Sequence, residues 1–360
     1  MADTTNSKMV NTSTTSAAPK TCGDFGLASC EYTPLYAIPV VPISALTICG
    51  NLFNIIVLTF TRGMHNNPGY FMFNLALTDL CVGVIMASFM APRILGGTWP
   101  ATRVQSDITA FFIQTTVSVS LMSLTGLSVD RYLNISRPLH YDRLMSKWRC
   151  IAILIGIWTL TGVLQLPPVF FGWGVFFYDS RSFLSYFDYA HSWEWTVGYN
   201  LIFTVPCLLA IFTCHVKIFR ITRRHIDAIN ATTVQSNANN KQRTSHKAMR
   251  TVVITITMFF ICWTPFCFEQ LSYSLSGNTV APWPQEVHML LLLLILSNSF
   301  MNCIIYSTTH KVFRDGARRI LRTVFCRRGS RPRVDPYDNE LRSRSKSLSV
   351  TISVVTDQQS

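Results

Sequence analysis

Residues 36–60 read YAIPVVPISALTICGNLFNIIVLTF and contain no charged residue. A helix of about 20 apolar residues crosses the roughly 30 Å hydrocarbon core of a bilayer. Six further apolar runs follow along the chain: Pro68–Pro92, Ile108–Val129, Cys150–Tyr178, Trp195–Val216, Thr251–Phe268 and Val287–Thr309. The pattern predicts an all-α fold, a seven-transmembrane helix bundle over residues 34–310.

The composition agrees with a chain that uses lipid as part of its solvent. Of its 360 residues, 49% are hydrophobic and 14% are charged, yet the net charge is +13. A soluble domain carries charge on about a quarter of its residues. The apolar content also excludes disorder for most of the chain.

The basic residues are distributed unevenly between the two sides of this bundle. The first tail and the links after the second, fourth and sixth runs hold only Lys8, Lys20, Arg93, Arg103 and Arg181. The other 26 of the 31 Lys and Arg lie in the alternate links and the last tail. By the positive-inside rule, we expect a multi-pass protein of the cell membrane with its N-terminus extracellular and its C-terminus cytoplasmic. Because the charge borders the membrane, no nucleic-acid partner is expected.

The first tail, residues 1–33, is polar and is expected to be extracellular and disordered. Asn11 begins an Asn-Thr-Ser sequon and is a predicted glycosylation site. Cys22 and Cys30 fall on the oxidising side, where they can form a short local disulfide.

The opposite end of the chain predicts a helix on the membrane surface. Residues 311–328 place apolar and basic side chains on opposite sides of a short eighth helix. Cys326 near its end is a predicted palmitoylation site. Residues 329–360 are basic and Ser-rich, and are expected to be a disordered cytoplasmic tail that phosphorylation can make acidic.

Several polar residues interrupt the apolar runs, and such residues are costly in a bilayer. They recur in the first, second, third and seventh runs: Asn51, Asp79, Ser120, Asn298 and Asn302. One carboxylate with several neutral oxygens can surround a small cation or a water cluster. The same residues can instead hold the helices together by hydrogen bonds, and both interpretations stay open.

Two motifs point to a conformational change. Asp130-Arg131-Tyr132 stands at the cytoplasmic end of the third run, where the acid can pair with Arg131 or leave it free to reach another partner. The sixth run contains Cys262-Trp263-Thr264-Pro265-Phe266. Proline removes a backbone donor and kinks a helix, so a small shift near Trp263 moves the cytoplasmic end a long way.

Together these motifs resemble the rhodopsin-like (class A) G-protein-coupled receptors over residues 34–328, with the look of the amine and opsin branches. The matching residues, in chain order, are Gly50-Asn51, Asn74 to Asp79, Asp130-Arg131-Tyr132, Trp158, Pro206, Cys262 to Pro265, Asn302 to Tyr306, and Phe313.

The resemblance implies a receptor that signals to heterotrimeric G proteins by outward movement of its sixth helix, with arrestin-type regulators as further partners. It assigns coupling and activation to Asp130, Arg131, Tyr132, Asn302, Tyr306, Trp263, Pro265, Phe259 and Pro206. It implies a sodium ion, as an allosteric ligand, at Asp79, Ser120, Asn298 and Asn302. No covalently bound cofactor is implied.

The chain also departs from the family pattern. The usual cysteine at the outer end of the third helix is Ser106, and the loop Trp173–Glu194 contains no cysteine to pair with it. Cys303 replaces the proline of the seventh helix, and Cys214 replaces the tyrosine of the fifth. Ser245 replaces the acidic residue that often restrains Arg131, so we expect appreciable ligand-independent signalling.

Two ligand-binding residues of related receptors are missing from this chain, and their absence narrows the class of ligand. Amine receptors carry an aspartate where this chain has Ile113, and opsins carry a lysine where it has Leu296. A buried ammonium beside Ile113 would lack a partner, although Glu269 or Asp188 offers a carboxylate nearer the mouth. We expect a small, uncharged or lipophilic ligand in a pocket lined by Ile113, Gln114, Val117, Trp195, Tyr199, Ile202, Trp263, Phe266, Gln270, His288, Leu292 and Leu296.

Three alternatives remain beside this hypothesis. The first is a biogenic amine receptor with a non-standard binding mode. The second is a membrane transporter, but the chain shows no detectable repeats of the kind that transporters have. The third is a membrane hydrolase, but His215, His288 and His310 have no nucleophile or metal ligands in register. We therefore expect no enzymatic activity.

Overall fold

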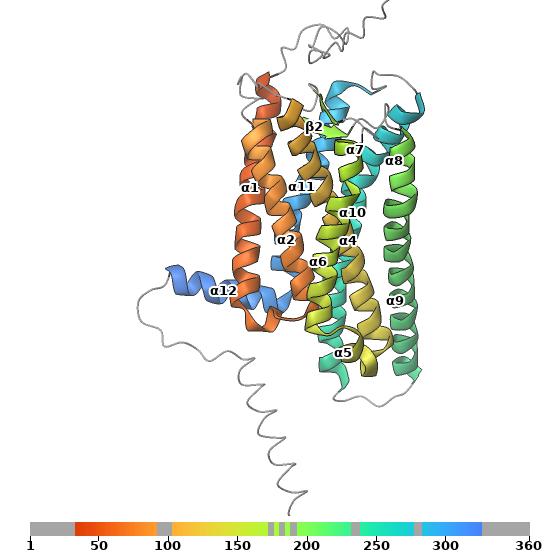
Figure 1. The fold of residues 1–360 in the computed structure, drawn as a ribbon. Coiled ribbons are helices and arrows are strands. Elements are labelled where there is room, and N and C mark those ends of the chain that lie inside the picture. Colours follow the sequence, from red (N-terminus) through yellow and green to blue (C-terminus); the bar gives the residue numbers. More distant parts are fainter. Residues whose placement is uncertain are drawn as a thin grey trace, which may run out of the picture.

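The computed structural model describes residues 33–91, 103–171, 176–179, 184–187, 193–231, 238–276 and 283–325. Within these residues, seven helical segments are long and apolar enough to cross a membrane, and they stand side by side as one bundle (Figure 1). The segments are Ile38–Phe60, Asn67–Met90, Asp107–Ser136, Lys147–Pro168, Glu194–Arg224, Val253–Ser272 and Glu286–Thr309. The predicted seven-helix bundle is confirmed.

Several spans are built from more than one helical element. The long helices are α1 (Thr33–Phe60), α2 (Asn67–Ile85), α4 (Arg103–Ser136), α6 (Lys147–Leu164), α9 (Val205–Ala231), α10 (Ala238–Ser276) and α11 (Gln285–Thr309). The shorter elements are η2 (Arg62–Met64), η4 (Pro138–His140), α5 (Tyr141–Leu144), α7 (Leu166–Phe170) and α8 (Trp193–Tyr199). Two π-helical turns, η3 (Met86–Met90) and η5 (Asn200–Thr204), continue α2 and precede α9.

Local polar signals determine where the described helices begin. The Asn66 side chain accepts a 3.0 Å hydrogen bond from the backbone N–H of Gly69 and caps α2. Pro68 follows in the first turn, where its missing N–H has no intrahelical partner to lose. Ser146 caps α6 in the same way through the N–H of Arg149.

The fourth run predicted from the sequence extends too far at its C-terminal end. We expected it to continue from Cys150 to Tyr178, but α6 ends at Leu164 and α7 ends at Phe170. Beyond them, β1 (Phe176–Asp179) pairs antiparallel with β2 (Leu184–Phe187), with Phe176 opposite Phe187. Aromatic residues favour this extended backbone, so a two-stranded hairpin is added to the otherwise helical fold.

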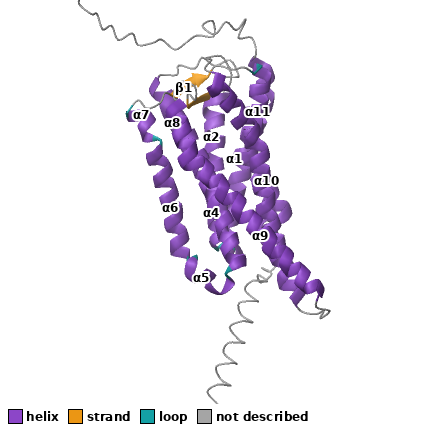
Figure 2. Ribbon diagram, turned by 90° about the vertical axis from the view of Figure 1, so that its right-hand side faces the viewer, coloured by secondary structure: helices purple, strands orange, loops and turns teal. Residues whose placement is uncertain are grey.

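The hairpin lies at one end of the bundle (Figure 2), and the last helix lies at the opposite end (Figure 1). We call them the hairpin end and the α12 end. At the α12 end, α12 (Lys311–Phe325) runs at a steep angle to the spans and projects outward beyond α1, as expected for the eighth helix, with Phe313, Gly316 and Ala317 buried (Figure 1). A Cβ atom on Gly316 would lie 2.1 Å from Thr61 Oγ1, so only glycine allows this close approach to the chain after α1.

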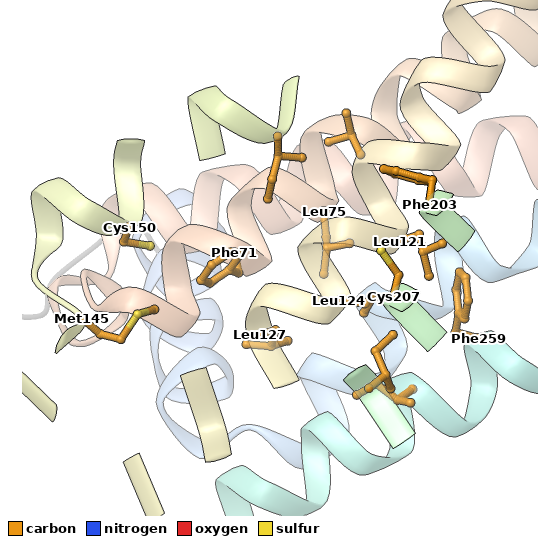
Figure 3. Close-up of a cluster of buried hydrophobic side chains, with 14 residues drawn as sticks. Phe71, Leu75, Leu121, Leu124, Leu127, Met145, Cys150, Phe203, Cys207 and Phe259 are labelled. Carbon is orange, nitrogen blue, oxygen red and sulfur yellow. The ribbon is translucent and has the colours of Figure 1, made fainter. Parts of the chain in front are cut away.

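The largest apolar core joins α2, α4, α6, η5, α9 and α10 (Figure 3). Phe71 and Leu75 of α2 pack there with Leu121, Leu124 and Leu127 of α4. A Cβ atom on Gly126 would lie 2.5 Å from the Phe71 ring, so this glycine allows α2 and α4 to approach. The polar side chains of Asn74, Ser123 and Trp158 join the same helices through two 2.8 Å hydrogen bonds.

Candidate functional site

The side chains predicted to line a ligand pocket form inward-facing stripes towards the hairpin end. The α11 residues Leu292 and Leu296 are buried in one apolar cluster, against which Ile113 of α4 packs. Trp263 of α10 and Tyr199 of α8 pack at the edge of the large core. Other predicted lining residues are partly buried on α4 and α10: Gln114, Val117, Phe266 and Gln270.

Tyr199 connects two of these helices through a hydrogen bond that the sequence did not reveal. Its hydroxyl lies 2.6 Å from the hydroxyl of Ser118 on α4. The Ser118 hydroxyl also lies 2.7 Å from the backbone carbonyl of Gln114 and donates to it, so Tyr199 donates to Ser118. The pocket stripe of α4 is thereby held against the fifth span.

The structure corrects one pocket residue. Ile202 is 80% exposed on the outside of the bundle, whereas Phe203 is 7% exposed and lies in the core. The cause is the π-helical turn η5, whose wider turn shifts the register relative to an ideal α-helix. Pro206 is also exposed, whereas Phe203 and Cys207 of this span enter the core with Leu121 and Phe259 (Figure 3).

The hairpin contributes its own residue to the pocket region. Leu184 of β2 is 6% exposed and belongs to the same apolar cluster as Leu292, Leu296 and Met289 of α11. Ser185 beside it is also buried. Apolar packing therefore holds β2 against α11, and the side chain of Ser106 lies outside the described residues.

A buried acid–base pair joins α10 and α11 above the predicted pocket. His288 Nδ1 lies 2.8 Å from Glu269 Oε1, and both side chains are at most 2% exposed. An ionised carboxylate only accepts, so the imidazole N–H donates. The sequence suggested both residues for the pocket region, but only the tertiary structure pairs them.

The polar residues inside the spans meet between α2 and α11. Asn302 Nδ2 donates a 2.8 Å hydrogen bond to Asp79 Oδ2, and Ser299 is a second hydrogen-bonding neighbour of this carboxylate. Ser120 donates to Thr78, the residue before Asp79, over 2.9 Å. Asn298 is half-buried one residue before Ser299. Oxygen atoms dominate this set, and Asp79 has no cationic partner among the described residues, so the residues fit a small hard cation.

The aromatic residues of the sixth span stack below the pocket. The rings of Trp263 and Phe259 lie 5.6 Å apart at an interplanar angle of 26°. Pro265 lies inside α10, two residues beyond Trp263. The stack therefore stands beside the point where the proline weakens the helix.

At the α12 end, Asp130 is paired with a residue that the sequence did not single out. The Tyr141 hydroxyl of α5 donates a 2.6 Å hydrogen bond to Asp130 Oδ1. Burial, and then this bond to the carboxylate, raise the pKa of Tyr141. Among the described residues, Arg131 forms no salt bridge with Asp130, and its Nε is buried without a hydrogen-bond partner. The spacing could not reveal this, because Tyr141 reaches Asp130 through the fold of α5.

Other predicted coupling residues lie around the same end. Lys217 Nζ of α9 sits 5.4 Å from the ring centre of Tyr132. Tyr306 of α11 is 1% exposed, and its ring contacts the Phe313 ring of α12 edge-on at 6.0 Å. The last turn of α11 is thereby packed onto α12. Asn11, Cys22, Cys30 and Cys326 lie outside the described residues.

A family model described as "7 transmembrane receptor (rhodopsin family)" matches residues 50–306. The chain belongs to this family. It is 30% identical to Probable G-protein coupled receptor 21 of Homo sapiens over 309 residues, which cover 82% of this chain and 85% of the relative. The "Rhodopsin, GQ-coupled" of Mizuhopecten yessoensis is 25% identical over 82% of this chain, which spans 61% of that relative.

The fold has a counterpart among solved structures. The crystal structure of squid rhodopsin superimposes with a TM-score of 0.74 at 19% sequence identity, over 84% of this chain and 83% of that one. This rhodopsin-family chain is a G-protein-coupled receptor and a multi-pass membrane protein, and not an enzyme. Family membership does not favour the transporter or the non-standard amine receptor.

Proposed function

We propose that this receptor sits in the cell membrane with its N-terminus and hairpin end outside, and binds a small, uncharged or lipophilic ligand there. The orientation is supported by the basic residues of the α12 end, including Arg318, Arg319 and Arg322. The ligand class is supported by the apolar cluster of Ile113, Leu292 and Leu296, with neutral Gln114 and Gln270 nearby. The ligand shifts the receptor only by its different affinity for two conformations.

Activation is proposed to move the cytoplasmic part of α10 outward. Trp263 rests on Phe259 next to Pro265, so a ligand above this stack bends the helix where its backbone bonding is weakest. Asn302 and Tyr306 on α11 respond to the same movement. The opening admits the end of a Gα subunit, which Arg131 binds.

The observation that supports this proposal most is that Arg131 forms no ion pair among the described residues. Asp130 accepts a hydrogen bond from Tyr141, and no described residue forms an ion pair with Arg131. The guanidinium is available to bind backbone carbonyls of a partner helix. Leu139 next to α5 is 94% exposed, which suits an apolar contact with the same partner.

Sodium is proposed as an allosteric ligand of the inactive conformation. Asp79, Ser120, Asn298 and Asn302 would hold it, with Ser299 added from the structure. The melting temperature of the purified receptor should be higher in sodium chloride than in choline chloride at equal ionic strength. Asp79→Asn should remove the difference, and the exposed Asp315→Asn should keep it.

The two tails are proposed to carry modifications and regulators. Asn11 is a glycosylation site, Cys22 and Cys30 form a disulfide, and Cys326 is palmitoylated where α12 meets the inner leaflet. Phosphorylated serines in residues 343–349 recruit arrestin-type proteins. Intact-protein mass spectrometry with and without reduction tests the covalent part.

The decisive experiment measures guanine nucleotide exchange on purified Gα subunits of each class, with the receptor in nanodiscs and no ligand added. The unmodified receptor should accelerate exchange on at least one class. Arg131→Ala should abolish this acceleration, and Leu139→Ala should weaken it. Arg137→Ala, on the exposed end of the same segment, is the matched control. Unchanged exchange with Arg131→Ala would refute the mechanism.

A further inference from the structure

Glu269 and His288 stand at the top of the two stripes that line the predicted pocket. On α10, Glu269 lies one turn beyond Phe266 and is 1% exposed. On α11, His288 precedes Leu292 and Leu296 at intervals of four. Both residues lie nearer the hairpin end than Trp263 and Leu292, so the pair stands above the apolar residues that are predicted to line the pocket.

The pair is buried but only half satisfied. Glu269 is 1% exposed, and its Oε1 accepts from His288 Nδ1 over 2.8 Å. Its second oxygen, Oε2, is buried and has no hydrogen-bond partner among the described residues. A buried carboxylate oxygen without a donor is costly, and native proteins rarely keep one without a reason.

The neighbours of the pair are aromatic and polar side chains of α10 and of the segment before α11. The Phe266 ring lies 6.2 Å from the His288 ring. Trp283 Nε1 donates to the Ser272 hydroxyl over 3.1 Å, and that hydroxyl donates to the backbone carbonyl of Glu269 over 2.7 Å. These two bonds join the last turns of α10 to the segment that precedes α11, at the level of Glu269.

We propose that Glu269 is the polar anchor of the ligand site, with one oxygen held by His288 and the other accepting a hydrogen bond from the ligand. The proposal rests on the receptor function above and specifies its ligand. The ligand is then an uncharged apolar molecule that carries an N–H or O–H donor at the end nearest the hairpin.

The chemistry of the anchor sets this specificity. An ionised carboxylate has only acceptors, so a ligand that presents a carbonyl or an ether at this point leaves Oε2 unpaired. A site built to bind a donor rejects an analogue that lacks it more strongly than an apolar pocket rejects an altered shape. The apolar side chains of Ile113, Leu292 and Leu296 contact the rest of the ligand.

The test uses indole and 1-methylindole, which differ in the N–H donor and fit an aromatic pocket. Their binding to the receptor in phosphatidylcholine nanodiscs is measured by saturation-transfer difference NMR. The unmodified receptor should prefer indole by about tenfold, because the bond to a charged acceptor is lost in the methylated compound.

Glu269→Gln is the decisive variant because it changes chemistry and hardly changes volume. His288 Nδ1–H holds the amide oxygen, so the amide NH2 takes the place of Oε2 and an acceptor becomes a donor. The preference for indole should vanish in this variant. Glu286→Gln, an exposed acid two residues before His288, is the control and should keep it.

Each result has one meaning. If the unmodified receptor shows no preference for indole, or if Glu269→Gln keeps the preference, the proposal that Glu269 anchors the ligand is refuted. Melting temperatures of the variants confirm that they are folded. Nucleotide exchange on Gα, measured on the same samples, reports the receptor function separately, so a failure of either proposal leaves the other one measurable.

Discussion

The hydroxyl of Tyr141 lies 2.6 Å from Oδ1 of Asp130, eleven residues earlier in the chain, and donates a hydrogen bond to it. Asn67 of α2 donates in turn to the Tyr141 hydroxyl over 3.2 Å and to the backbone carbonyl of Met145. Three segments, α2, α4 and α5, therefore meet at the Tyr141 hydroxyl. This arrangement occupies Asp130 and leaves its neighbour Arg131 without an ion pair among the residues described.

Tyr141→Phe should lower ligand-independent nucleotide exchange several-fold. Without the hydroxyl, the buried Asp130 lacks its donor and turns to Arg131, which is then less available to Gα. The free energy of unfolding should also fall by about 1.5–3 kcal/mol, the cost of a lost hydrogen bond to a charged group. Exchange assays and thermal melting measure the two effects. Asp142→Asn, on the next and exposed residue, should change neither, and unaltered exchange in Tyr141→Phe would contradict the explanation.

Phe203→Ala and Ile202→Ala test the register of the fifth span. Phe203 is in the core, so its truncation should cost about 3–5 kcal/mol of unfolding free energy. Ile202 faces outward, so its truncation should cost less than about 0.5 kcal/mol. Melting temperatures of the two purified variants give the comparison. Equal losses would show that the π-helical turn is misplaced.

Gly316→Ala should weaken the attachment of α12. The added methyl group meets Thr61 Oγ1 at 2.1 Å, and overpacking of this kind costs about 1–3 kcal/mol. The second variant, Gly316→Ala with Thr61→Gly, removes the obstructing side chain and should recover part of the loss. Gly156→Ala, where no atom lies within 4 Å of the new Cβ, serves as the control. Differential scanning fluorimetry is sufficient to rank the melting temperatures of the three variants.

His310 should make the receptor sensitive to acid. Burial, and then the charge of Arg131, lower the pKa of His310 to about 4, and its neutral Nδ1 accepts the N–H of Phe313 at the start of α12. In the unfolded chain, His310 takes up a proton near pH 6.5. Its contribution to the free energy of unfolding is therefore fully present above that pH, and it is lost as the pH falls towards 4.

The expected loss over this window is on the order of 2 kcal/mol. His310→Gln retains an acceptor but does not titrate, so melting temperatures between pH 7.5 and 4.5 should change less in this variant. His140→Gln, at an exposed histidine, should follow the unmodified protein. A parallel acid response in the His310 variant would assign the effect to other groups.

Long-range polar contacts mark the limit of what sequence reasoning found at the candidate sites. Asp79 and Asn302 both interrupt apolar runs, which groups them in the sequence, and the fold places Asn302 Nδ2 2.8 Å from Asp79 Oδ2. Ser299 was not singled out, since a serine in a spanning helix commonly bonds to its own backbone. Tyr141 and the Glu269–His288 bond depend on how separate helices pack.

The seven spans, the surface helix and the family follow from the amino-acid sequence alone, because hydrophobic length and short motifs are local properties of each segment. Tertiary structure decided the end of the fourth span, the hairpin, and the inward position of Phe203 in place of Ile202. It also decided the partner of Asp130 and the pairing of Glu269 with His288. These features depend on which helix faces which, and one π-helical turn or one close glycine contact changes that without altering the hydrophobic pattern.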